Sequence, residues 1–326
     1  MARRLGSFGG PQTRRLVAAL AVAGGLLAGV VALPTTALAV SPAAWTSRAA
    51  IPSAETHAQA PALAAYDGLL YAVWAGQSSP YHLWYSAYNG TSWTAQAEIP
   101  SAITNYETGA SLAVYDSKLY VMWQGASGYN IWYSTFNGSS WTAQTETTFQ
   151  DFNSSIAGLA VYNGDLYLSW LNFSYGINYS DFNGSTWSAV ATVPSAQSTN
   201  FESSDVPLAV LRSDLFVSWE SSASALMYSF FNGTVWSTPA SIGPLSDAGP
   251  ALATKGSKLY ASFMNYSTLK VSYAVYNGTA WKPAKNIPGT SYHVQTGPGI
   301  ALYNGSIYVA WLPTFDPSPI DYVSTT

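Results

Sequence analysis

The sequence has no cysteine, few charged residues and only three histidines among its 326 residues. Without cysteine the chain cannot form disulfides, zinc–thiolate sites or a cysteine nucleophile. The histidines, His57, His82 and His293, follow no metal-ligand spacing, and no Ser-His-Asp arrangement stands out. We therefore expect neither a metal site nor a cofactor.

Basic charge is concentrated at the start of the chain. Four of the 12 basic residues, and none of the 16 acidic ones, lie in the first 39 residues. These arginines precede an apolar run over residues 16–33, and Ala37-Leu38-Ala39 supplies a small-residue cleavage motif. This order predicts a signal peptide over residues 1–39 and a secreted, extracellular protein. An uncleaved membrane anchor is the alternative, because 18 apolar residues are nearly long enough to span a bilayer.

Removal of the leader would leave 12 − 4 = 8 basic residues against 16 acidic ones. Such an acidic chain is a poor partner for nucleic acid or an anionic membrane surface. Its abundant Ser, Thr, Asn and Tyr residues predict a surface that forms hydrogen bonds rather than ion pairs. We expect a monomer that does not insert into membranes after signal removal.

One unit of strands recurs along the chain. It combines a Leu-Tyr-x-x-Trp strand, a Tyr-Ser strand and an Asn-Gly-x-x-Trp segment. The closing tryptophans are separated by 48, 48, 46, 49 and 45 residues, and are Trp45, Trp93, Trp141, Trp187, Trp236 and Trp281. Short aromatic strands repeated at this spacing predict an array of small sheets.

The two ends of the array are complementary. Trp45 has no strands of the unit before it, whereas the segments around Tyr308 and Tyr322 lack a closing tryptophan strand. A closed ring uses this offset, because the first strand can complete the last sheet and remove two open edges. We predict an all-β, six-bladed β-propeller over residues 40–326, with four antiparallel strands per blade. A strand near residues 44–51 should pair with residues 321–325.

The second repeat illustrates the predicted blade. Its strands are expected over residues 110–115, 119–125, 130–136 and 141–147. Asn137-Gly138 separates the last two strands and predicts a two-residue type I′ hairpin turn. The corresponding Asn-Gly pairs begin at Asn89, Asn183, Asn232 and Asn277. The turns at this end are short, so we expect the longer and more variable loops of the opposite face to carry any site.

Eleven of the 13 tryptophans fall at repeat positions that predict packing between blades. Trp84 and Trp132 instead occupy a third-strand position where later repeats have Asn178, Met227, Ser272 and Asp321. A position that accepts such different residues is not a core position. Trp84 and Trp132 are therefore candidate exposed ligand-binding surfaces, with incidental exposure as the alternative.

The segments that cross from one blade to the next hold a second set of candidates. An aromatic ring beside an amide or a carboxylate suits a sugar, because the ring covers C–H groups while the polar group binds hydroxyls. Alternatively, the rings fill gaps between blades. The candidate residues are Asn105, Tyr106, Glu107, Asn200, Phe201, Glu202, Tyr292 and His293.

Several strings, including those over residues 61–64, 119–125 and 133–141, resemble repeats of secreted microbial β-propellers of the tachylectin-like and fucose-lectin-like groups. The resemblance covers residues 42–326. It implies carbohydrate binding at several sites between blades. Fucose lectins of this shape use an arginine and a glutamate in each site, whereas this chain keeps only Arg48 and Arg212 after the leader.

Catalysis is not expected. A sialidase-type site would need three arginines, and propeller glycosidases need paired carboxylates near the axis. None of the predicted innermost strands contains a charged residue. We expect a lectin-like propeller that binds glycans or glycoconjugates. A scaffold for protein interactions or the cell surface is the alternative, and a glycoside hydrolase or sialidase-like enzyme is less favoured.

Overall fold

The computed structural model describes residues 44–56, 59–105, 108–151, 157–198, 205–246, 248–291, 296–313 and 318–326. The predicted signal peptide, residues 1–39, lies outside the described residues and stays a prediction. In the part of the chain that is described, no helix is long and apolar enough to cross a membrane.

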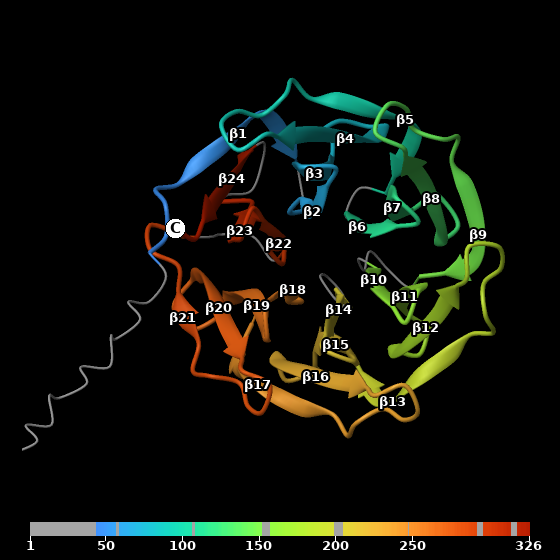
Figure 1. Ribbon diagram of the computed structural model, residues 1–326, viewed down its shortest axis with the longest axis vertical. Helices are drawn as coiled ribbons and strands as arrows, with labels where there is room; N and C mark the ends of the chain where they lie inside the picture. Colours follow the sequence, from blue (N-terminus) through green and yellow to red (C-terminus); the bar gives the residue numbers. More distant parts are fainter. Residues whose placement is uncertain are drawn as a thin grey trace, which may run out of the picture. The chain divides into compact units, whose positions relative to one another are not determined.

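The described residues form six four-stranded sheets around a common axis (Figure 1). Neighbouring strands within each sheet are antiparallel. This confirms the predicted all-β, six-bladed propeller. In each of blades 1 to 3 the four strands follow one another in chain order from the innermost to the outermost. They are β2 Ala62–Tyr66, β3 Leu69–Ala75, β4 Tyr81–Tyr88, β5 Ala97–Thr104, β6 Ala110–Tyr115, β7 Lys118–Gln124, β8 Asn130–Phe136, β9 Thr145–Gln150, β10 Gly158–Tyr162, β11 Asp165–Leu171, β12 Gly176–Phe182 and β13 Ala191–Gln197.

Blades 4 and 5 follow the same plan, whereas blade 6 takes its outermost strand from the beginning of the propeller. The strands of these three blades are β14 Leu208–Leu211, β15 Asp214–Glu220, β16 Ala225–Phe231, β17 Ala240–Leu245, β18 Ala251–Lys255, β19 Lys258–Asn265, β20 Lys270–Tyr276, β21 Lys285–Asn286, β22 Gly299–Tyr303, β23 Ser306–Trp311, β24 Ser318–Ser324 and β1 Ala49–Thr56. The innermost strands contact one another in sequence, and β22 returns to contact β2.

The pairing of β1 with β24 closes the ring, and we call this pairing the seam. Ala49 lies opposite Tyr322, and a separate bridge joins Trp45 to Thr325. The Thr46 backbone N–H also donates a hydrogen bond of 2.8 Å to the Ser324 carbonyl. The seam confirms the predicted closure, although the regular strand begins at Ala49 and continues beyond residue 51 to Thr56.

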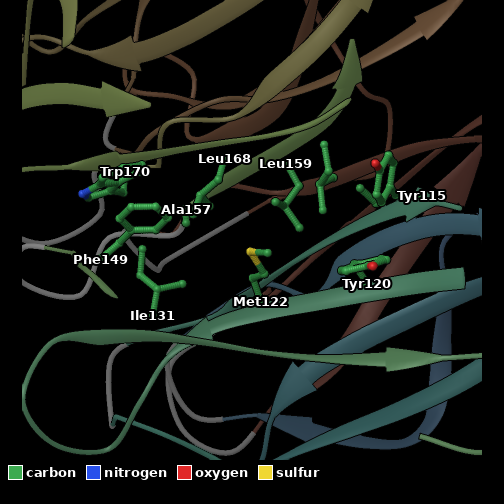
Figure 2. Packing of buried hydrophobic residues seen from close by; sticks show 11 residues of the cluster. Tyr115, Tyr120, Met122, Ile131, Phe149, Ala157, Leu159, Leu168 and Trp170 are labelled. Carbon is green, nitrogen blue, oxygen red and sulfur yellow. The ribbon is translucent and has the colours of Figure 1, made fainter. Parts of the chain in front are cut away.

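Large side chains fill the space between neighbouring blades. Figure 2 shows one such cluster, in which Met122 and Ile131 of blade 2 face Leu159 and Trp170 of blade 3. The second-strand aromatics are at most 2% exposed, which confirms their predicted packing role; they are Trp74, Trp123, Trp170, Trp219, Phe263 and Trp311.

The closing tryptophans pack against the preceding blade. Trp141 of blade 2 meets Tyr85 of blade 1 edge-on, with ring centroids 5.5 Å apart. The other five make similar contacts at 5.3 to 5.7 Å, in the pairs Trp45–Tyr273, Trp93–Tyr322, Trp187–Phe149, Trp236–Tyr179 and Trp281–Tyr228. A blade therefore borrows part of its core from its neighbour, as the small size of each sheet requires.

The Asn-Gly turns differ from the prediction. A bridge between Tyr88 and Trp93 encloses four residues rather than two, and only Gly90 among them has a positive φ, of 99°. The Asn89 Oδ1 atom accepts hydrogen bonds from the backbone N–H groups of Thr91 and Ser92, each 2.9 Å long. The predicted type I′ hairpin is wrong because this side chain organises a longer loop.

The fourth strand consequently starts later than predicted. In blade 2 Trp141 forms only an isolated bridge with Phe136, and β9 begins at Thr145. Turns with two positive φ angles, as type I′ requires, occur instead between the first and second strands. At Asp67-Gly68 these angles are 48° and 75°.

Tyrosine hydroxyls at the ends of innermost strands tie neighbouring blades together. The Tyr66 hydroxyl donates to the Ser117 carbonyl, and the Tyr162 hydroxyl donates to the Ser213 carbonyl, both at 3.0 Å. The Tyr303 hydroxyl donates to the Gly68 carbonyl, also at 3.0 Å, and thereby joins blade 6 to blade 1. The same type of hydrogen bond thus recurs at three junctions between neighbouring blades.

Tyr303→Phe is expected to lower the free energy of unfolding by about 1 kcal/mol, because it leaves the Gly68 carbonyl without this donor. Denaturant unfolding measures the change. Tyr266→Phe, at a residue that is 56% exposed, is the control and should be neutral. Equal stability of the Tyr303→Phe and control variants would contradict a role for the hydroxyl in closure.

Asp321 makes the stability of the seam depend on pH. Burial raises the pKa of its carboxyl above the ordinary value of 3.8, and the ion pair with Arg48, 3.1 Å long, offsets this only in part. The folded state therefore holds the proton more tightly, so the stability contribution of Asp321 falls as pH rises through the raised pKa. The unfolding free energy of the wild type minus that of Asp321→Asn should decrease as pH rises from the ordinary pKa through the raised pKa of Asp321. A difference independent of pH would contradict this assignment.

Candidate functional site

Trp84 and Trp132 lie on the third strands of blades 1 and 2, where each is partly buried rather than fully exposed. Each indole lines a shallow pocket between its own blade and the outermost strand of the preceding blade. The structure thus gives the two candidates equivalent surroundings. We call these the blade 1 pocket and the blade 2 pocket.

The blade 1 pocket has a volume of about 370 Å³. Ser53 of β1 lies on one side, and His82 and Trp84 of β4 lie on the other. Gln96 and the β3–β4 loop, residues 76–80, complete the lining. The pocket is therefore built from the seam strand and from the variable loop face on which sequence analysis placed the site.

The blade 2 pocket repeats this arrangement in about 160 Å³. Ser101, Trp132 and Gln144 occupy the positions of Ser53, Trp84 and Gln96. The β7–β8 loop supplies Gly125, Ala126 and Ser127. Counted from the glycine to the tryptophan, this loop is one residue shorter than its blade 1 counterpart.

Two local sequence features shape both pockets. Ser53 and Ser101 follow a proline in the outermost strands and have φ angles of 59° and 61°, at irregularities in the strand pairing. Such bulges bend a strand and re-aim its side chains. Gly76 and Gly125 lie directly beneath the indoles, because an added Cβ would be 2.8 Å from Trp84 Nε1 and 2.5 Å from Trp132 Nε1.

A glutamate lies opposite each of these tryptophans in the strand register. Glu98 faces Trp84, and Glu146 faces Trp132. Residues directly opposite in an antiparallel pair share one face of the sheet, with Cβ atoms about 4.5–5.5 Å apart. Each indole therefore has a carboxylate beside it, which sequence analysis missed because spacing alone does not show cross-strand register.

The two glutamates have different partners. In blade 1 the His82 Nδ1 and Glu98 Oε1 atoms are 2.7 Å apart. In blade 2 the Asn130 side-chain amide donates to Glu146 Oε1 and accepts a 3.0 Å hydrogen bond from Gln150 Nε2. Each carboxylate thus contacts the residue two positions before its tryptophan, and Glu98 remains 40% exposed.

The combination of tryptophan and glutamate is confined to blades 1 and 2. At the corresponding cross-strand positions the other blades have the pairs Asn178–Thr192, Met227–Ser241, Ser272–Asn286 and Asp321–Ala50. In blade 3 Asn178 Oδ1 accepts hydrogen bonds from Asn172 and Thr192, and in blade 6 Asp321 pairs with Arg48. These side chains are engaged within the scaffold.

Most of the crossing-segment candidates cannot be placed. Tyr106, Glu107, Asn200, Phe201, Glu202, Tyr292 and His293 lie outside the described residues. Asn105 is described, and its backbone carbonyl accepts a hydrogen bond from the Thr108 hydroxyl at 3.3 Å. The structure does not bring Asn105 into either tryptophan pocket.

A third pocket, of about 120 Å³, lies among the innermost strands. Its lining is mainly Ala, Pro, Gly, Leu and Ile, and Asp205 is the one charged residue among the described lining residues. Asp205 precedes β14, so it was not among the predicted innermost strands. β18 ends at Lys255, so one observed innermost strand carries a charged residue at its end. Within the described chain no group of three or more His, Asp or Glu residues could hold a metal ion.

No protein-family model and no curated protein matches the sequence. Solved structures do match the fold. The protein AofleA from Arthrobotrys oligospora is 10% identical, with a TM-score of 0.62 over 85% of each chain. A mutant Aleuria aurantia lectin bound to α-methyl-L-fucoside is 14% identical, with a TM-score of 0.60 over 79% of this chain and 88% of the lectin.

Sialidases are among the similar structures as well. NanB sialidase from Streptococcus pneumoniae is 11% identical, with a TM-score of 0.62, and the match covers 86% of this chain and 69% of the enzyme. At these identities the likeness concerns the fold alone. The chain therefore has a six-bladed β-propeller fold similar to those of a fungal fucose-binding lectin and a bacterial sialidase.

Proposed function

We propose that this chain is a secreted, multivalent carbohydrate-binding propeller without catalytic activity, and that the blade 1 and blade 2 pockets are its glycan sites. The observation that carries the proposal is the repeated set of tryptophan, glutamine and serine that lines two equivalent pockets, with a glutamate opposite each tryptophan in the strand register. The similarity to a lectin bound to a fucoside supports it.

The chemistry of the pockets fits a saccharide. An indole face covers the apolar C–H side of a sugar ring, while the glutamine amide and the serine hydroxyl exchange hydrogen bonds with its hydroxyls. The blade 1 volume of about 370 Å³ lies within the usual range for small-ligand sites of roughly 300–1,000 Å³. The smaller blade 2 pocket, of about 160 Å³, suits one terminal sugar unit.

Two open pockets suggest weak binding at each site and tighter binding to a surface. When one molecule engages two glycans at once, the second event is intramolecular and the apparent affinity rises by about 10²–10⁴. Attachment to a glycan-bearing surface would benefit from this effect. The signal peptide predicted over residues 1–39 would deliver the protein to such surfaces.

The similarity to sialidases makes a glycosidase the competing hypothesis. Such an enzyme would require paired carboxylates around a glycosidic bond. The described lining of the axial pocket supplies Asp205 as its one carboxylate, and Arg48, one of the two arginines after the leader, pairs with Asp321 at the seam. These observations favour binding over hydrolysis.

Trp84→Ala and Trp132→Ala should each weaken binding to a glycan-coated surface by at least about tenfold, because each removes one of two cooperating sites. The double variant should lose binding. A glycan array, with unfolding curves to confirm an intact fold, measures the effect. Tyr266→Ala removes an aromatic residue that is 56% exposed and should bind like wild type.

A blank array for the folded wild-type protein would contradict the proposal and favour the protein-interaction or cell-surface scaffold. Binding that survives the double substitution would place the glycan site elsewhere on the propeller. Release of a fluorogenic aglycone from a glycoside would instead revive the enzyme hypothesis.

A further inference from the structure

A glutamate lies opposite the indole of each tryptophan pocket in the strand register. These residues are Glu98 and Glu146, and no lysine or arginine lines either pocket among the described residues. A carboxylate at a binding site repels anionic sugars and attracts cations. From these charges we propose that the two pockets select saccharides with a free primary amine over N-acetylated and anionic saccharides. This inference rests on the proposed glycan-binding function.

The geometry supplies two interactions for one ammonium group. A protonated amine that donates to Glu98 or Glu146 forms a charge-assisted hydrogen bond, which is stronger than a hydrogen bond between neutral groups. Because the opposing indole lies on the same sheet face, the ammonium can also approach the ring within the roughly 6 Å of a cation–π contact. An acetamido group at the same place offers neither a charge nor three donors.

The carboxylates are oriented for this role by their neighbours. Asn130 links Gln150 to Glu146 through consecutive hydrogen bonds, so the blade 2 carboxylate is held in place by neutral side chains. A ligand ammonium at Glu146 therefore meets a carboxylate whose hydrogen-bonding neighbours carry no positive charge.

The blade 1 pocket provides a natural comparison. There His82 contacts Glu98 at 2.7 Å, where Asn130 contacts Glu146 in blade 2. A protonated histidine would compensate the carboxylate, whereas an amide cannot. Glu146 is therefore the stronger selector for an amine of the two glutamates, and His82→Asn should bring the blade 1 pocket to the same selectivity.

The test compares hexamers of β-1,4-linked glucosamine and of its N-acetylated form by isothermal titration calorimetry on the full propeller at low ionic strength. Wild-type protein should bind the glucosamine hexamer about tenfold more tightly. The preference should shrink as salt is added, because screening weakens interactions between partly exposed charges. In the Glu98→Gln/Glu146→Gln variant the preference should be lost, so that the two hexamers bind equally.

The matched control is Asp67→Asn/Asp116→Asn, which also removes two negative charges but at turns that line neither tryptophan pocket. Both aspartates have positive φ angles, which asparagine tolerates. This control should keep the preference. If the control variant loses the preference as the glutamine variant does, a general charge effect replaces selection at the pockets. If the glutamine variant keeps the preference, Glu98 and Glu146 are not its source and the inference is overturned.

The outcomes also separate this inference from the proposed function. Equal binding of both hexamers by wild-type protein, lost in Trp84→Ala/Trp132→Ala, would overturn amine selection and leave the glycan sites standing. Tighter binding of the N-acetylated hexamer would do the same. Absence of binding to any saccharide would overturn both.

Discussion

The structure depends on one constraint, which is that no blade can bury its own aromatic side chains. Trp141 completes its packing on Tyr85 of the preceding blade, and Met122 and Ile131 complete theirs on Leu159 and Trp170 of the next. Each sheet therefore needs a neighbour on both sides, and only a closed ring gives every sheet two. The β1–β24 seam satisfies this need without disulfides, which the lack of cysteine excludes.

The same constraint explains which repeat positions vary. Third-strand tyrosines such as Tyr85 and Tyr322 contact a tryptophan from the neighbouring blade, so a change there would open a gap in shared packing. The preceding position, Trp84 in blade 1, lies at a pocket instead. It can change from blade to blade without disturbing the ring. In blades 1 and 2 it lines a pocket, whereas Asn178 and Ser272 form internal hydrogen bonds and Asp321 forms an ion pair.

Both arginines outside the leader contribute to the scaffold. Arg48 pairs with Asp321 at the seam, and Arg212 lies against Gly278 of the next blade, where an added Cβ would be 2.4 Å from Arg212 Nη2. Neither arginine lines a tryptophan pocket, and a glutamate lies opposite each tryptophan instead. The two pockets thus differ in charge from the arginine-and-glutamate sites implied by the resemblance to fucose lectins.

The sequence by itself determined the blade number, the strand order and the closure, because a repeat with complementary ends admits one ring. It also singled out Trp84 and Trp132 as candidate binding residues through their irregular position in the repeat, and the structure places both at pockets. The tertiary structure decided the Asn-Gly loops, where the Asn89 side chain reshapes the turn. It also decided which residues share a pocket. Ser53 lines a pocket with Trp84 from a different blade, and Glu98 lies opposite Trp84 in the strand register. Bulges and register set these positions, and sequence spacing alone does not encode either.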